Sequence, residues 1–296
     1  MEPSSIVDRQ DVRARVHGMW AAVAPGWDEH AGSVDARTAG LAERLLDLAS
    51  IAPGDRVLEL ACGPGGLGIA AARRIDGIEV VLSDVAAPMV AIAASRADGL
   101  GNVRARVLDL EEIDEPDRSF DVLLCREGLM FAADPERAGR ELHRIARPGA
   151  RVALSVWGPR ERNPWLGVVF DAMTAQLGEP VPPPGVGERE RPGDAGRLAS
   201  LLGSAGFEAV AVEEHPVPLR AASFDEWWSR TSTIAGPLAK RLAAMPEAAT
   251  AALEARLREA VAPYSSADGL ELPGLALVAS ARRGRSDLID DVVNRD

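Results

Sequence analysis

The residues whose types and spacing could do chemistry lie at positions 56–68, in the run RVLELACGPGGLG. This run predicts a buried strand, a glycine-rich turn and the start of a helix. Glycine has no Cβ and accepts positive φ angles, so the backbone of such a turn can approach a ligand closely. The start of the helix adds free N–H groups and the positive end of the helix dipole. Together these features indicate a site for a nucleotide-like cofactor.

Two classes of cofactor fit this segment. The spacing of Gly63, Gly65 and Gly68 matches the dinucleotide fingerprint G-x-G-x-x-G. Asp84 follows Gly63 by 21 residues, close to the roughly 20 expected of a ribose-binding acid. Glu59 speaks against a dinucleotide and for the second class, cationic cofactors. It lies within the apolar run, where a dinucleotide fold does not usually need an acid. A carboxylate at this strand end suits a cationic ligand that carries an amino group.

The elements that position this turn are predicted by alternating strand and helix patterns. Short apolar runs, typical of buried strands, end near Ala61, Asp84, Leu108, Cys125 and Trp157. Helical patterns separate them at 66–75, 87–97 and 135–147. This alternation predicts a parallel sheet with helices on both faces, and ligands of such sheets bind outside the carboxyl ends of the strands.

The segments on either side of this core are predicted to be mostly helical. Before it, a helix over 8–23 is expected to stop at Pro25, and Ser33 can cap a second helix. After it, two further strands are expected over 206–219 and 270–282. The remaining predictions are helices at 163–177, 223–231, 234–243 and 247–262 and a Pro- and Gly-rich loop at 178–193.

The acid and the glycines stand as Glu59-Leu60-Ala61-Cys62-Gly63-Pro64-Gly65. This run resembles the first motif, acid-x-G-x-G-x-G, of the class I S-adenosylmethionine (SAM)-dependent methyltransferases, with Ala61 where the family most often has glycine. The later segments that resemble the family's second to fifth strands are 82–89, 107–110, 119–125 and 147–157. Within the class, the segments 19–27 and 157–159 resemble the ubiquinone/menaquinone-biosynthesis C-methyltransferase group.

The resemblance implies the fold and the organisation of the chain. The implied fold is α/β and Rossmann-like: a mostly parallel seven-stranded sheet with helices on both faces and helical cap insertions. The implied parts are an N-terminal helical lid (1–50), a SAM-binding core (51–160), the remaining strands with helical substrate-cap insertions (161–283) and a frayed tail (284–296).

The resemblance also implies SAM as the cofactor, S-adenosyl-L-homocysteine as its product, and a set of residues around it. The cofactor-binding residues that it indicates are Glu59, Ala61, Cys62, Gly63, Asp84, Val85, Met89, Asp109, Leu110 and Cys125. It indicates no metal ion, and it assigns no catalytic residue.

Four of these residues have a second interpretation. Glu59 either orders the glycine-rich loop and the amino end of SAM or is a buried acid satisfied by backbone N–H groups. Asp84 either accepts hydrogen bonds from the ribose hydroxyls or caps the next helix. Met89 either packs on the adenine ring or belongs to the core. Asp109 either accepts the adenine amino group or is an exposed acid after a strand.

Aromatic residues make up only 4% of the chain, so their positions are informative. Trp20 and Trp27 either close over the cofactor, where their faces attract the sulfonium, or pin the N-terminal helix to the sheet. Trp227 and Trp228 begin the cap and are candidates to line a pocket for an apolar acceptor. At most one of them faces it, because neighbours on a helix point about 100° apart.

The segment after the fourth strand departs from the resembled group. Glu127 and Met130 stand where that group often has glutamines, so the acceptor does not follow from the resemblance. Arg126 and Glu127 are candidates to pair with each other.

Histidines are candidate bases, and the chain has four: His17, His30, His143 and His215. Only His17 and His30, which flank the N-terminal tryptophans, are expected near an acceptor. A lone histidine is more often structural than catalytic.

Composition narrows the class of partner. The chain of 296 residues carries a net charge of −12, which repels phosphate backbones and speaks against a nucleic-acid substrate. Cys62 and Cys125, its two cysteines, indicate neither a disulfide framework nor a metal site and suit the cytoplasm. The first residues lack a signal-peptide pattern, and no run approaches the roughly 18 apolar residues of a membrane span. Both a monomer and a homodimer remain open.

Three functions are compatible with the sequence. The first is SAM-dependent methyl transfer to the oxygen, nitrogen or carbon of a small-molecule acceptor. The second is SAM binding without methyl transfer, in a rearrangement or a regulatory role. The third and least supported is an NAD(P)-dependent oxidoreductase, which Glu59, Pro64 and the long helical stretch before the first strand speak against.

Overall fold

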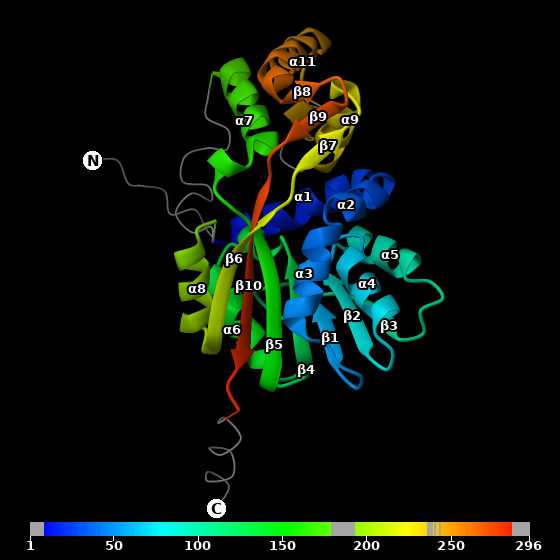
Figure 1. The fold of residues 1–296 in the computed structure, drawn as a ribbon, viewed down its shortest axis with the longest axis vertical. Helices are drawn as coiled ribbons and strands as arrows, with labels where there is room; N and C mark the ends of the chain where they lie inside the picture. The colour runs from blue at the N-terminus through cyan, green and yellow to red at the C-terminus, as the bar shows by residue number, and fades with distance from the viewer. Residues whose placement is uncertain (1–8, 179–192, 236–238, 240, 243, 286–296) are drawn as a thin grey trace, which may run out of the picture.

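The computed structural model describes residues 9–178, 193–235, 239, 241–242 and 244–285 (Figure 1). Nearly all of the tail expected to fray at 284–296 and of the loop expected at 178–193 lies outside the described residues. The same holds for part of the helix expected at 234–243.

Seven strands form the central sheet in the order β3-β2-β1-β4-β5-β10-β6. The pairs among β1 to β5 are parallel, and β10 runs antiparallel to both of its neighbours. The strands are β1 Arg56–Glu59, β2 Glu79–Asp84, β3 Val103–Val107, β4 Phe120–Arg126, β5 Ala146–Trp157, β6 Phe207–Pro216 and β10 Leu275–Arg283. The mostly parallel, seven-stranded Rossmann-like sheet is therefore confirmed.

Helices cover both faces of this sheet, and each face buries its own apolar cluster. Strand β4 shows the alternation that this requires: Val122 and Leu124 belong to one cluster, and Leu123 and Cys125 to the other. The covering helices are α3 Ala39–Ala49, α4 Gly66–Arg74 and α5 Ala87–Arg96 on one face, and α6 Pro135–Ile145 and α8 Ala195–Ser204 on the other (Figure 1).

A second unit, the cap, stands at the end of the sheet where β5 finishes (Figure 1). Trp227 is fully buried within an apolar cluster that belongs to the cap alone, so this unit has its own core. The cap consists of α7 Pro164–Leu177, α9 Phe224–Ile234, α11 Glu247–Val261 and a small antiparallel sheet of β7 Leu219–Ala221, β9 Gly269–Leu272 and β8 Ser265–Ser266.

The chain passes from β5 into α7 of the cap, and two further crossings lie side by side: β6 leads into β7, and β9 leads into β10. Between these two, the Val217 N–H donates to the Gly274 carbonyl at 2.8 Å. A Cβ on Gly274 would lie 2.1 Å from the Val217 oxygen, so this approach requires glycine. The strands expected at 206–219 and 270–282 are thus each divided, because Pro216, Pro218 and Pro273 lack the N–H that a continuous ladder needs.

The N-terminal helices α1 (Arg9–Glu29) and α2 (Ala31–Arg37) lie between the cap and the sheet (Figure 1). The prediction that the first helix stops at Pro25 is wrong, because α1 continues through it. A Cβ on Gly26 would lie 2.7 Å from the Thr233 oxygen of α9. Such close packing against the cap offsets the cost of a proline inside a helix, about 3 kcal/mol.

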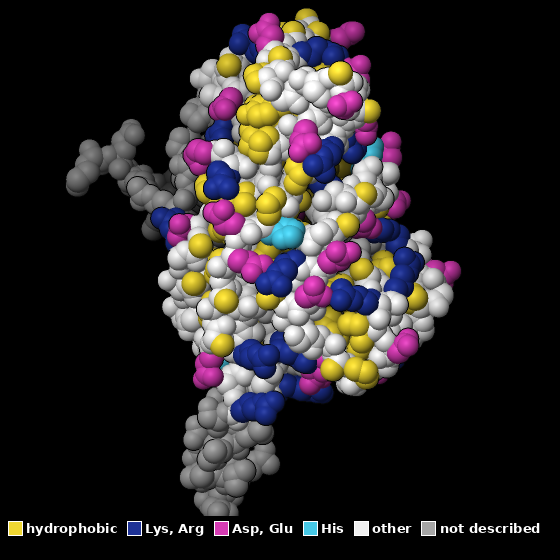
Figure 2. All heavy atoms as spheres, in the orientation of Figure 1, with side chains coloured by type: hydrophobic (Ala, Val, Ile, Leu, Met, Phe, Trp, Pro, Cys, Tyr) yellow, Lys and Arg dark blue, Asp and Glu magenta, His cyan; other side chains and the backbone are white. Residues whose placement is uncertain are grey.

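The surface seen in Figure 2 carries acidic and basic side chains mixed over the cap and most of the core. Within the described part of the chain, no helix has the length and apolar character needed to cross a membrane.

Candidate active site

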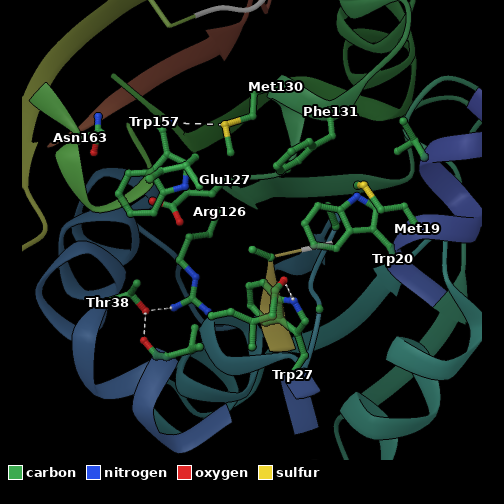
Figure 3. A pocket seen from close by; sticks show the side chains of 18 of the residues that line it. Met19, Trp20, Trp27, Thr38, Arg126, Glu127, Met130, Phe131, Trp157 and Asn163 are labelled. Carbon is green, nitrogen blue, oxygen red and sulfur yellow. Dashed lines mark hydrogen bonds between the residues drawn. The ribbon is translucent and has the colours of Figure 1, made fainter. Parts of the chain in front are cut away.

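A cavity of about 830 Å³ lies at the carboxyl ends of the sheet strands, between the sheet, α1 and the cap. Residues of the glycine-rich loop and the strand ends line one part of it. Figure 3 shows Trp20 and Trp27 of α1, Glu127 after β4 and Trp157 at the end of β5 around this space. A cavity of this size, apolar with a few charged groups, is typical of a small-molecule site. Aromatic side chains line the other part: Trp20, Phe131, Trp157, Trp165 and Phe170.

The glycine-rich loop bends through three residues with positive φ: Ala61 at +50°, Gly63 at +51° and Gly65 at +81°. Glycine adopts such angles readily, whereas alanine at position 61 holds an uncommon conformation. Farther on, a Cβ at Gly68 would lie 2.7 Å from Glu59 Oε2. The glycine at this position therefore allows α4 to begin directly against the end of β1.

Glu59 lies behind the loop, because it is 1% exposed and is not part of the cavity wall. Its Oε2 accepts a hydrogen bond from the Gly68 N–H at 2.7 Å. Burial raises the pKa of Glu59 to about 7, while the positive charge of Arg126 and this hydrogen bond act in the opposite direction. This hydrogen bond fixes the start of α4, and with it the glycine-rich loop, against the end of β1.

Asp84 ends β2 and reaches the cavity wall. Its Oδ2 accepts a hydrogen bond from the Gly63 N–H at 3.0 Å, and its Oδ1 accepts one from the Ala86 N–H at 2.9 Å. Burial raises the pKa of Asp84 above its ordinary value, and the backbone hydrogen bonds oppose this effect. Each carboxylate oxygen keeps further lone-pair capacity. Asp84 can therefore hold the loop and still accept hydrogen bonds from ligand hydroxyls.

The cavity wall includes most of the other residues indicated by the sequence, and Cys125 is an exception. Its buried thiol lies behind Gly128, where a Cβ would be 3.0 Å from Cys125 Sγ. Burial raises the pKa of Cys125 to about 12, so this thiol is unreactive at neutral pH. The residues that do reach the wall, besides Asp84, are Ala61, Cys62, Gly63, Val85, Met89, Asp109 and Leu110.

Asp109, which follows β3, is held by the N-terminal helix. Arg13 Nε donates to Asp109 Oδ2 at 2.5 Å, and His17 Nε2 lies 3.0 Å from the same oxygen. Arg13 also donates to Glu112 Oε2 at 3.2 Å. Sequence reasoning missed this contact, because it joins residues 96 positions apart. The ion pairs fix α1 across the cavity.

Trp20 and Trp27 line the cavity and anchor α1 at the same time (Figure 3). The Trp20 ring packs edge-on against Phe131 and Trp27, with centroids 4.8 Å and 6.0 Å away. Trp27 Nε1 donates to the Ile234 carbonyl of the cap at 3.0 Å. The two interpretations of these tryptophans are therefore compatible.

The tryptophans that line the acceptor part of the cavity differ from those expected: Trp157 ends β5, and Trp165 belongs to α7 of the cap. The expectation that Trp227 or Trp228 lines the pocket is wrong, because both belong to the apolar core of the cap. Trp157 and Trp165 line the cavity instead, with ring centroids 5.0 Å apart. The guanidinium carbon of Arg37 lies 4.3 Å from the Trp165 centroid and 5.1 Å from the Trp157 centroid, close enough for cation–π attraction.

The comparisons with known proteins agree with this site. Residues 57–149 match a family model described as a methyltransferase domain. Demethylmenaquinone methyltransferase of Thermus thermophilus is 36% identical over 128 residues, which cover 43% of this chain and 58% of that protein. Ubiquinone/menaquinone biosynthesis C-methyltransferase UbiE of Ralstonia pickettii is 32% identical over 181 residues, covering 54% of this chain and 73% of that protein. The chain belongs to the class I SAM-dependent methyltransferases.

The fold of this methyltransferase family member is shared with solved structures. The YcgJ protein from Bacillus subtilis aligns with a TM-score of 0.58 and 18% identity, over 82% of this chain and 97% of that one. The relation to the ubiquinone/menaquinone-biosynthesis group, expected from the sequence, is confirmed. The chain nevertheless spans less than two thirds of the length of the Thermus thermophilus relative.

The residues at the strand ends fit the cofactor of this methyltransferase family. The loop with positive φ angles at Ala61 and Gly63 presents backbone and small side chains to the cavity. The adjoining wall combines the carboxylate of Asp84 with the apolar side chains of Met89 and Leu110. Such a wall suits a ligand that joins hydroxyl groups, a flat base and a cationic centre.

The segment after β4 holds the most unusual residue of the methyltransferase cavity. Glu127 has a φ of +58° and lines the wall, and no hydrogen-bond partner for its buried Oε1 is found among the described residues. Arg126 does not form the expected ion pair with Glu127. It donates a hydrogen bond to Thr38 Oγ1 at 2.6 Å, and its guanidinium lies 3.6 Å from the carboxylate of Asp35. Of the four histidines, His17 and His30 line the cavity.

Proposed function

We propose that this protein transfers the methyl group of SAM to a small-molecule acceptor and leaves S-adenosylhomocysteine. The observation that carries the proposal is a single cavity that joins the predicted cofactor residues to an aromatic compartment. Asp84 and Gly63 belong to the first part, and Trp157 and Trp165 to the second. When bound, SAM supplies a methyl group that its positively charged sulfur already makes electrophilic. The protein then has to hold the acceptor in line and exclude water.

The roles of the cofactor residues follow from their positions. Asp84 accepts hydrogen bonds from the ribose hydroxyls, while Val85, Met89 and Leu110 pack around the adenine. The loop at 61–63 faces the methionine part. Glu59 and Cys125 support these contacts from behind the wall. Asp109 borders the adenine region and holds Arg13 of α1.

The same proposal assigns a function to each segment of the chain. The described residues of 1–50 form the lid, residues 51–160 bind the cofactor, and the described residues of 161–283 provide the acceptor cap with the remaining strands. Lid and cap together surround the cavity, which keeps the acceptor near the methyl group. Proximity and orientation of this kind can supply up to roughly 7–11 kcal/mol of the barrier.

The proposed acceptor is a small molecule, and the proposed location is the cytoplasm. The net charge of −12 speaks against nucleic acid. Cys62 and Cys125 are free and buried thiols, as expected in a reducing compartment.

The test is to incubate the purified protein with SAM and a panel of phenols, amines and carbon acids. Mass spectrometry then measures S-adenosylhomocysteine and the methylated acceptor. Formation of both products is the expected result. SAM binding without any S-adenosylhomocysteine across the panel would favour the non-transferring role, and the absence of SAM binding would contradict both.

A further inference from the structure

Glu127 stands where the cofactor part of the cavity meets the acceptor part. It directly follows β4, and its N–H donates to the Ser155 carbonyl of β5 at 2.9 Å. The next residue, Gly128, packs on the glycine-rich loop so closely that a Cβ there would lie 2.3 Å from the Ala61 Cβ. Figure 3 shows Glu127 among the side chains around the cavity, with Trp157 and Met130. Glu127 therefore directly precedes, in the sequence, a residue that contacts the glycine-rich loop.

The backbone at Glu127 is held in an uncommon conformation. Its φ of +58° lies in the left-handed region, which residues with a Cβ rarely adopt. Strained residues of this kind persist where the surrounding structure fixes them, and they gather at active sites. Here the constraint comes from the Ser155 hydrogen bond and the packing of Gly128. These two contacts therefore hold the backbone in the conformation that directs the carboxylate to the cavity wall.

One carboxylate oxygen of Glu127, Oε1, is buried and lacks a hydrogen-bond partner among the described residues. Two neighbouring cations act on Glu127 only through their charge: Arg126 donates its hydrogen bond to Thr38, and Arg37 Nη2 donates to the Val217 carbonyl at 3.3 Å, while Arg37 Nε also has no hydrogen-bond partner among the described residues. Buried polar atoms are normally hydrogen-bonded. An unpartnered acceptor on a cavity wall thus indicates a ligand that brings its own donor.

The protonation behaviour of Glu127 suits a proton acceptor at neutral pH. Burial raises its pKa to about 7, while the charges of Arg126 on β4 and Arg37 on α2 act in the opposite direction. A general base works best with a pKa near the operating pH. Neither His17 nor His30 is needed for this role.

We infer that Glu127 is the general base of the proposed methyl transfer and that the acceptor is a hydroxyl group on a flat, largely apolar molecule, a phenol or an enol. The inference rests on the proposed function. The aromatic wall formed by Trp157, Trp165 and Phe170 fits the flat molecule, and the unpartnered oxygen of Glu127 fits its hydroxyl.

The step balances in atoms and charge. Glu127 takes the hydroxyl proton while the acceptor oxygen forms its bond to the methyl carbon. The electron pair of the methyl–sulfur bond passes to sulfur, which loses its positive charge and becomes a thioether. The acceptor becomes a methyl ether, and Glu127 later releases its proton to solvent.

The activity test uses 2-naphthols whose substituents grade the acidity of the hydroxyl. Glu127→Gln keeps the size of the side chain but cannot accept a proton, and Glu43→Gln, on the exposed face of α3, is the matched control. We expect Glu127→Gln to lower kcat by about 10²- to 10⁴-fold for weakly acidic naphthols. The loss should shrink toward none for naphthols that are already ionised. In the unaltered protein kcat/KM should rise with pH through about 7, and this rise should disappear in Glu127→Gln.

A measurement without cofactor or acceptor tests the same residue. Infrared spectra recorded from pH 5 to 9 report protonated carboxyl groups, and Glu127→Gln should remove one carboxyl band that titrates near pH 7. An unchanged spectrum would overturn the inference, as would an equal loss of kcat across all naphthols.

The proposed function and the inference fail in different ways. Titration calorimetry with SAM measures cofactor binding separately, and Glu127→Gln should leave this affinity within about twofold of the unaltered protein. If SAM binds and amines are methylated while hydroxyls are not, the base assignment is wrong and the methyltransferase function stands. If SAM does not bind, the proposed function itself is contradicted, and the inference falls with it.

Discussion

At the scale of single residues, the site is dominated by carboxylates that the fold has removed from water. Glu59, Asp84 and Glu127 follow or end three neighbouring strands, and burial raises the pKa of each. Glu59 and Asp84 accept backbone hydrogen bonds, while the Oε1 of Glu127 does not. Of the three, Asp84 and Glu127 line the cavity and keep acceptor capacity for a ligand.

Asp84 provides the first prediction at this scale. Asp84→Asn removes the negative charge but keeps an acceptor oxygen, so the charge-assisted hydrogen bonds to the ribose become neutral ones. A loss of about 1.5–3 kcal/mol corresponds to a roughly 10- to 100-fold rise in the Kd for SAM. Titration calorimetry measures it. Asp76→Asn, in an exposed turn, should leave the Kd unchanged, and an unchanged Kd in Asp84→Asn would show that Asp84 does not contact the ribose.

Glu59 provides a prediction about pH and stability. Its pKa is about 7 in the folded protein and 4.5 as the ordinary value, so between these pH values the folded state keeps a proton that the unfolded chain has released. The free energy of unfolding therefore falls as pH rises from about 4.5 to 7. Glu59→Gln should reduce this fall, by no more than about 3 kcal/mol.

Urea unfolding at pH 5 and pH 8 checks this sign, with Glu43→Gln as the exposed control. Glu127 contributes a fall of the same sign, so some pH dependence should persist in Glu59→Gln. An equal fall in the unaltered protein and in Glu59→Gln would show that Glu59 does not titrate as described.

At the scale of elements, α1 is the part whose role depends most on long-range contacts. It is tied to the end of β3 through Arg13 and Asp109, and to the cap through Trp27 and Ile234. The residues of both connections line the cavity. The helix therefore links the end of β3 to the cap, and in the proposed function this is how it closes over the cofactor.

Loosening α1 gives the third prediction. Arg13→Ala removes a partly exposed ion pair worth about 1 kcal/mol at most, so SAM affinity should fall only a few-fold. Hydrogen exchange should instead rise across residues 9–29. Arg15→Ala, on the exposed side of the same helix, should change neither quantity. Unchanged exchange in Arg13→Ala would mean that the Asp109 contact does not hold the helix.

The sequence predicted local elements better than contacts between them. The glycine-rich turn and the acids at the ends of β1 and β2 follow from short-range pattern, because a turn conformation and a buried strand are set by neighbouring residues. The contact of Arg13 with Asp109 depends on how distant segments pack, which periodicity does not report. Trp227 illustrates the same limit: its helix pattern marks an apolar face but does not say whether that face meets a cavity or the core of the cap.

At the scale of the whole molecule, two units meet around one cavity. The cap has its own apolar core and joins the sheet through the β6–β7 and β9–β10 crossings, where Gly274 fits closely against Val217. Cofactor residues belong to the sheet unit, whereas Trp165 and Phe170 belong to the cap. In the proposed function, this separation lets the cap define the acceptor without disturbing the cofactor site.

The most direct test of the central claim is thermal unfolding of the protein with SAM, S-adenosylhomocysteine, NAD⁺ and NADP⁺ in parallel. A ligand at 100 times its Kd stabilises the folded state by about 2.7 kcal/mol, which raises the Tm by roughly 2–4 °C for a chain of this size. We predict this rise with SAM and S-adenosylhomocysteine and none with the nicotinamide cofactors. A rise of the Tm with NAD⁺ or NADP⁺ alone would contradict the SAM site. It would also contradict the interpretation of Glu59 as evidence against a dinucleotide.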